Sequence, residues 1–168
     1  AIRHNDYSPQ RTDAYGDDLV VYPVDGYGTQ ESVRSIIRTE KPDMLWFMTD
    51  PRFFGWLWEI EDEIRSLIPM VYYHVWDNYP YPNYNRNFYL SNDKIVTISK
   101  VTSDIVQTVA PEVDEQYLPH AVDPKIFKKH DEETVKEFRK EHFPEEEEKK
   151  FTFFWNSRNA RRKPSGSM

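Results

Sequence analysis

The stretch MVYYHVWD, residues Met70 to Asp77, is the segment from which the fold can be worked out. It is an uninterrupted run of β-branched and aromatic residues with one histidine, and Pro69 precedes it while Asn78 and Pro80 follow. A short run of this composition between turn-forming residues is typical of a strand that is buried on both faces. We therefore predict a central β-strand here.

Similar apolar runs recur on both sides of this strand and alternate with segments of helical periodicity. The predicted strands are Leu19–Val24, Met44–Asp50, Lys94–Ser99, a short one within residues 115–127, and Phe151–Ser157. The predicted helices lie between Thr29 and Pro42, from about Phe54 to Pro69, within residues 101–113 and over residues 131–143, while polar residues 1–18 are predicted to be a long loop. Alternation of this kind favours an α/β fold with a doubly wound, Rossmann-like parallel sheet and helices on both of its faces.

Composition narrows the classes of function. The chain has 168 residues, a net charge of -7 and no cysteine, which excludes disulfides, a thiolate nucleophile and a zinc–thiolate site. An acidic surface argues against nucleic acid and anionic membranes as partners. The sequence has no apolar run long enough to span a membrane and no signal-peptide pattern, and with the missing cysteines this indicates a cytoplasmic location. No metal-binding motif is present, so we expect no metal and no cofactor.

In a parallel sheet, ligands bind beyond the carboxyl ends of the strands. The segments that follow the predicted strands therefore hold the candidate site residues. These segments are Asp25–Thr29, Thr49–Arg52, His74–Asn78, Ser99–Ser103, His120–Asp123 and Asn156–Lys163.

Three segments of the sequence resemble retaining glycosyltransferases of the GT-B fold (the family-4-like group). The segments are NDKIVTISKVTSDIV at residues 92–106, YLPHAVDPKIF at 117–127 and FTFFWNSRNARRKPSG at 151–166. His120 and Ala121 stand where the family has Asn-Gly, and Pro164 stands where it usually has glycine. The resemblance implies an acceptor-side Rossmann-like domain over 1–143 that lacks its first strand, a linker over 144–150, and the start of a donor-binding domain over 151–168.

The same resemblance implies a function. The parent enzyme would transfer a sugar from a UDP- or GDP-sugar to a hydroxyl of a carbohydrate-like acceptor, with retention, and the isolated piece would have no turnover. Arg158 and Lys163 would bind the donor diphosphate, and His74 and Asp77 would be catalytic. The residues expected to bind the acceptor or sugar are Trp76, Asn78, Tyr79, Ser99 and His120.

The residues themselves leave other interpretations open. His74 could be a satisfied core histidine, Asp77 could cap the following loop, and Ser99 could bond at a helix N-terminus. The tyrosine- and asparagine-rich segment 76–89 could belong to a non-catalytic module that binds a glycan or a protein. A sugar-nucleotide epimerase is a third class, and exposed sheet edges could support a homo-oligomer.

Overall fold

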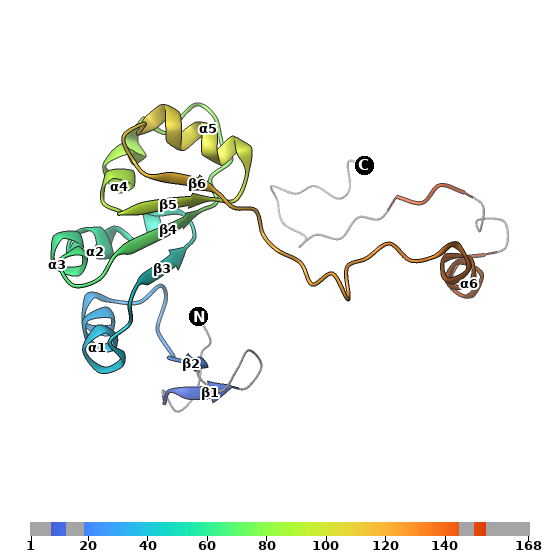
Figure 1. Cartoon of the computed structure of the whole chain (residues 1–168), viewed down its shortest axis with the longest axis horizontal. Coiled ribbons are helices and arrows are strands. Elements are labelled where there is room, and N and C mark those ends of the chain that lie inside the picture. The colour runs from blue at the N-terminus through green and yellow to red at the C-terminus, as the bar shows by residue number, and fades with distance from the viewer. Residues whose placement is uncertain (1–7, 13–18, 145–149, 154–168) are drawn as a thin grey trace. The chain divides into compact units, whose positions relative to one another are not determined.

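A four-stranded parallel sheet is the central feature of the fold (Figure 1). Its strands are β3 (Leu45–Met48), β4 (Met70–His74), β5 (Lys94–Thr97) and β6 (Glu115–Tyr117), in the spatial order β3-β4-β5-β6. Phe47 of β3 is in register with Tyr72 of β4, and Tyr72 is in register with Ile95 of β5. All five residues of β4 are buried, as the segment MVYYHVWD predicts. The prediction of an α/β fold with a Rossmann-like parallel sheet is confirmed.

The computed structural model describes residues 8–12, 19–144 and 150–153. The chain divides into two compact units, Ala1–Ala121 and Val122–Met168. The parallel sheet and helices α1 to α5 belong to the first unit, and α6 belongs to the second. This division comes before α6, whereas the sequence predicts a first domain that extends to residue 143. The predicted domain limits stay a prediction.

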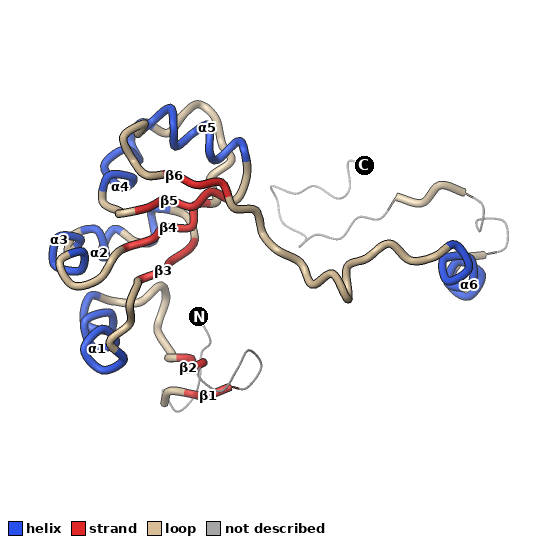
Figure 2. The backbone as a smooth tube through the Cα atoms, in the orientation of Figure 1, coloured by secondary structure: helices blue, strands red, loops and turns tan. Residues whose placement is uncertain are grey.

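Three helices begin where the sequence indicates (Figure 2). Helix α1 (Gln30–Glu40) has Thr29 as its N-cap, with reciprocal bonds between Thr29 and Ser32. Helix α5 (Lys100–Val109) is capped by Ser99, and α6 (Glu132–His142) is capped by Asp131. In each case a side-chain oxygen accepts a bond from a backbone N–H of the first turn that would otherwise have no partner.

The single helix predicted from about Phe54 to Pro69 is wrong. The structure has a 3₁₀ turn at Pro51–Phe53 followed by two short helices, α2 (Gly55–Trp58) and α3 (Glu61–Arg65). The helix is interrupted at Ile60, whose φ of -119° is not helical. Trp58 and Ile64 reach the same buried cluster from the two sides of this break, so tertiary packing overrides the helical periodicity.

The tyrosine- and asparagine-rich segment after β4, for which no helix is predicted, also contains helical turns. They are a 3₁₀ turn at Asn83–Asn85 and helix α4 (Arg86–Leu90). Tyr89 of α4 is completely buried, so this part of the segment belongs to the core.

The N-terminal strands do not join the parallel sheet. Strand β2 (Leu19–Val21) pairs antiparallel with β1 (Gln10–Thr12), which lies in the segment predicted to be a loop. The residues of β2 are only partly buried. The prediction that Leu19–Val24 is a buried strand of the main sheet is therefore wrong, because its partner is a neighbouring strand in the sequence.

Helices α1 to α5 cover one face of the sheet. Side chains from each of them, including Val33, Leu57, Ile64, Tyr89 and Ile105, meet the strand residues Phe47, Tyr72 and Ile95 in one cluster. The cluster on the other face consists of Val71, Tyr73 and Val96, with Val75 and Ile98 packed against it. No helical residue belongs to this second cluster in the part of the chain that the structure describes.

The sequence predicts helices on both faces of the sheet, but α1 to α5 lie on one face. The strand order explains this difference. Each successive strand is added on the same side of the previous one. Parallel crossovers are right-handed in nearly all proteins, so successive steps in one direction place every helix on the same face. Crossover helices of this sheet would cover the second face only if the strand order reversed direction.

The second unit is described over residues 122–144 and 150–153. Arg139 of α6 donates to the Lys150 carbonyl (2.6 Å) and to the Thr152 hydroxyl (3.1 Å). Phe151, Thr152 and Phe153 are not in a strand, whereas the sequence predicts a strand that begins at Phe151. The remainder of that predicted strand lies outside the described residues.

The two faces of β3 make a testable prediction. Phe47 is 7% exposed and lies in the helix-covered core, whereas Trp46 is 47% exposed on the other face. Phe47→Ala should lower the free energy of unfolding by about 3–5 kcal/mol, and Trp46→Ala by no more than about half of that. Urea denaturation of the two variants compares these losses. An equal loss would mean that the Trp46 face is covered as fully as the other.

Candidate functional site

The carboxyl edge of the parallel sheet is the candidate site, and the segment that follows β4 forms one part of it. We call residues 76–89 the aromatic loop. The Trp76 indole N–H donates to the Asn78 carbonyl (3.2 Å), and the Trp76 ring meets Tyr84 edge-on with centroids 6.2 Å apart. Tyr79 and Tyr81 form a similar edge-on pair at 5.3 Å. Asp77, Asn78 and Tyr79 are exposed, so their side chains are available to a ligand.

A hydroxyl pair connects the aromatic loop to helix α5. Ser99 Oγ accepts from the backbone N–H of Thr102 (3.1 Å), and the two side-chain oxygens lie 2.9 Å apart. The Thr102 hydroxyl donates to the Trp76 carbonyl (2.8 Å), so the Ser99 hydroxyl donates to Thr102 Oγ1. Ser99 thus serves the helix N-terminus, as one of the two interpretations of the sequence expects, and its contact with a sugar stays a prediction.

Thr102 lies in the candidate segment Ser99–Ser103, but the sequence gives it no role of its own. Its side chain is fully buried, and it joins the start of α5 to the start of the aromatic loop. The signal in the sequence is its position three residues after the N-cap Ser99, where a hydroxyl can bond back to the cap.

His74 lies inside the core and not at the surface of the edge. It is 0% exposed, with Nδ1 3.0 Å from the Tyr72 hydroxyl and Nε2 2.8 Å from the Tyr89 hydroxyl. The Tyr72 hydroxyl in turn donates to the Thr49 carbonyl. We call this series, from Tyr89 through His74 and Tyr72 to the Thr49 carbonyl, the hydrogen-bond relay.

For a neutral imidazole, only one placement of protons satisfies the whole relay. A carbonyl can only accept, so the Tyr72 proton is directed to Thr49 and the Tyr72 oxygen must accept from His74 Nδ1–H. His74 Nε2 then carries no proton and accepts from the Tyr89 hydroxyl. In a neutral imidazole the relay therefore places the proton on Nδ1.

The electrostatics of the site agree with this assignment. Burial lowers the pKa of His74 to about 3, which keeps the imidazole neutral at physiological pH. Burial also raises the pKa of Tyr89 to about 12 and raises the pKa of Tyr72, with smaller effects on Tyr72 from Tyr89 and the Asp50 carboxylate. All three side chains are therefore uncharged and fully occupied as hydrogen-bonding groups. The catalytic role predicted for His74 stays a prediction, and it would require an opening of this core.

His120 lies near the opposite face of the sheet from His74. Its ring stacks on Tyr73 with centroids 5.3 Å apart, and its Nδ1 is 3.3 Å from the Tyr73 hydroxyl. Side chains alternate between the faces of a strand, so the adjacent residues Tyr73 and His74 point to different faces. The two histidines nominated from the sequence are therefore not brought together. His120 lines a shallow hollow of about 280 Å³ together with Trp46, Met48, Tyr73 and residues 118–121.

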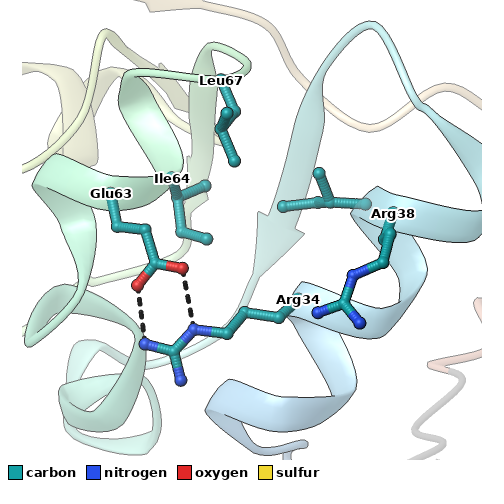
Figure 3. Close-up of a pocket in the computed structure, with 6 residues that line it drawn as sticks. Arg34, Arg38, Glu63, Ile64 and Leu67 are labelled. Carbon is teal, nitrogen blue, oxygen red and sulfur yellow. Dashed lines mark hydrogen bonds and ion pairs between the residues drawn. The ribbon is translucent and has the colours of Figure 1, made fainter.

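A second hollow, of about 290 Å³, lies between α1 and α3 (Figure 3). Figure 3 shows Arg34 reaching across to Glu63, and the two bonds between them measure 2.8 and 2.6 Å. The hydrogen bonds from Arg34 lower the pKa of the Glu63 carboxyl. Arg34 is committed to this ion pair, so we assign the hollow a structural role in joining the two helices.

The remaining predictions concern the donor site, metal ions, membranes and oligomers. Arg158 and Lys163 lie outside the described residues, and their role stays a prediction. Within residues 8–12, 19–144 and 150–153, no three His, Asp or Glu side chains lie together as a metal ion would need. None of the described helices has both the length and the apolar character needed to cross a membrane. Homo-oligomerisation through the outer strands β3 and β6 is likewise untested.

Comparison with known proteins gives no family for this chain. No protein-family model matches the sequence, and no curated protein matches it.

The buried histidine predicts a pH dependence of stability. The pKa of His74 is about 3 in the folded state and about 6.5 in an unfolded chain. Below about pH 6.5 the unfolded state therefore binds a proton that the folded state does not bind. The free energy of unfolding should fall as the pH drops below this value, by up to about 1.4 kcal/mol per pH unit. Urea denaturation at pH 6.5, 6.0, 5.5 and 5.0 measures this slope.

His74→Gln is the matched variant because glutamine does not titrate. Its slope over the same pH range should be much smaller, even if the variant is less stable at pH 7. Equal slopes for the two proteins would show that His74 takes up no proton on unfolding.

Proposed function

We propose that the chain forms the acceptor-side part of a retaining glycosyltransferase of the GT-B fold, with a sheet that is doubly wound in the intact protein. The reaction would transfer a sugar from a UDP- or GDP-sugar to a hydroxyl of a carbohydrate-like acceptor. The absence of cysteine from all 168 residues suits an enzyme of the reducing cytoplasm. The proposal rests on the resemblance over residues 92–127 and 151–166 and on the chemistry of the carboxyl edge.

The aromatic loop is the observation that carries the proposal. It presents Asn78 beside Tyr79, and both side chains are exposed where β4 reaches the edge of the sheet. The C–H faces of a sugar ring pack well on aromatic rings, and amide groups exchange hydrogen bonds with sugar hydroxyls. This edge of a parallel α/β sheet is where such proteins bind their ligands.

Asp77 is the carboxylate best suited to the acceptor. It is exposed and lies between Trp76 and Asn78 in the sequence. In the proposed reaction the bond between the sugar and the donor diphosphate breaks and a bond to the acceptor oxygen forms. Asp77 would orient the acceptor hydroxyl and accept its proton.

Arg158 and Lys163 would act on the donor. Negative charge grows on the diphosphate as the sugar leaves, so cations held near it stabilise the transition state more than the bound substrate. An arginine supplies a planar pair of donors and a lysine a point charge, and the two complement each other on phosphate groups.

A non-catalytic binding module is the second candidate. The specific observation in its favour is the exposure of Tyr79 (58%), Tyr81 (40%) and Tyr84 (73%) within one loop. Exposed tyrosines in one segment are typical of surfaces that recognise proteins or glycans.

A transfer assay on the natural protein that carries this chain separates the two candidates. Arg158→Ala and Lys163→Ala should each lower the rate of sugar transfer by about 10²–10³, the usual effect of losing one transition-state contact. Asp77→Asn should also lower kcat. Absence of transfer from any UDP- or GDP-sugar by the unmodified protein would contradict the enzyme proposal.

Glycan binding by the aromatic loop can be measured without turnover. Tyr79→Ala should weaken binding to an oligosaccharide array or to a soluble oligosaccharide by roughly tenfold, since a lost ring contact costs about 1–2 kcal/mol. Phe138→Ala is the control, because Phe138 is exposed to a similar extent (55%) but lies on α6. Equal effects of the two substitutions would show that the aromatic loop is not part of the glycan-binding site.

A further inference from the structure

Thr49 has a backbone conformation that threonine rarely adopts. Its φ is +147°, and among the described residues the other non-glycine residue with positive φ, Lys41, is the C-cap of α1, where a left-handed residue is common. Such a conformation at a β-branched residue costs about 1–3 kcal/mol and persists only when the surroundings hold it in place. Thr49 directly follows β3, at the carboxyl edge of the sheet.

The surroundings of Thr49 include the end of the hydrogen-bond relay. The Tyr72 hydroxyl donates to the Thr49 carbonyl, and Tyr72 is itself completely buried. The Tyr72 ring is fixed independently of its hydroxyl, because it stacks on Phe47 (5.0 Å) and meets Trp58 edge-on (5.7 Å). His74 then determines where the hydroxyl proton points, since its Nδ1–H donates to the Tyr72 oxygen, while Tyr89 acts one step away by donating to His74 Nε2.

The turn that begins after Thr49 carries polar side chains at the carboxyl edge. Asp50 Oδ1 accepts from the Arg52 backbone N–H (3.3 Å), and Asp50 Oδ2 is 3.2 Å from the Arg52 guanidinium. The Phe53 N–H donates to the Asp50 carbonyl (3.1 Å), and the Phe53 ring stacks on Tyr27 at 4.2 Å. The direction in which the chain leaves Thr49 therefore sets the place of this whole turn.

We propose that Tyr72 is a positioning residue. Its hydroxyl, oriented by His74 and Tyr89, holds Thr49 in the strained conformation and so fixes the turn Asp50–Phe53 as a second wall of the carboxyl edge beside the aromatic loop. The relay ends at Tyr89, which is the last residue of the aromatic loop, so one set of buried bonds connects the two segments. This inference is independent of glycosyl transfer.

Hydrogen–deuterium exchange of the whole chain tests the proposal. The backbone N–H groups of Phe53 and Phe54 donate within the turn, to Asp50 and Pro51, so their exchange rates report its integrity. Tyr72→Phe removes one hydroxyl and keeps the ring. It should speed exchange at Phe53 and Phe54 by at least about tenfold relative to the slowest amides of β4, because a lost buried hydrogen bond is worth about 1–3 kcal/mol.

Tyr73→Phe is the matched control. Tyr73 is the next residue of β4, is also buried, and also donates its hydroxyl to a backbone carbonyl, that of Leu118 (2.9 Å). It should leave exchange at Phe53 and Phe54 unchanged. Equal acceleration by Tyr72→Phe and Tyr73→Phe, or acceleration by neither, would overturn the proposal.

Two further variants separate positioning from general loss of packing. Thr49→Gly in the Tyr72→Phe protein should return the two exchange rates toward those of the unmodified chain, because glycine adopts positive φ without strain. Tyr89→Phe, which keeps the bond between Tyr72 and Thr49, should accelerate exchange less than Tyr72→Phe does. If Tyr72→Phe does not fold, unchanged rates in Tyr89→Phe would by themselves contradict the role of the relay.

Discussion

The neutral imidazole of His74 is the constraint on which the carboxyl edge depends. It lies in the central strand of the sheet, without contact to solvent, and bonds to one tyrosine of its own strand and to one of α4. A charged imidazole would have two N–H donors, and Nε2–H could not accept the Tyr89 proton. The burial that lowers the pKa of His74 therefore also determines the direction of every bond as far as Thr49.

The order of the strands sets the second constraint. Because β3, β4, β5 and β6 follow one another in space as they do in sequence, helices α1 to α5 share one face and bury Phe47, Tyr72 and Ile95 beneath them. The relay runs through this covered face, where water cannot compete for its bonds. At the carboxyl edge lie the aromatic loop that follows β4, the turn Asp50–Phe53 that follows β3, and the capped start of α5.

The elements that sequence predicts well are those determined by neighbouring residues. Thr29, Ser99 and Asp131 signal their helices because a cap bonds within one turn. The break at Ile60, the pairing of β1 with β2 and the placement of α1 to α5 on one face depend on contacts between distant residues, and local pattern does not specify them. The exposed position of Asp77, Asn78 and Tyr79 is found from their place after β4. The partners of His74 are not, since Tyr89 lies 15 residues away in a segment for which no helix is predicted.

The hydrogen-bond relay supports the proposed ligand site from within the core, and it depends on the protonation state of His74. Nitrogen-15 NMR of the imidazole distinguishes the two neutral tautomers and the charged form. At pH 6 we predict a neutral His74 with its proton on Nδ1 and an unprotonated Nε2. A proton on Nε2, or a charged imidazole at that pH, would contradict the relay and the positioning of Thr49 that follows from it.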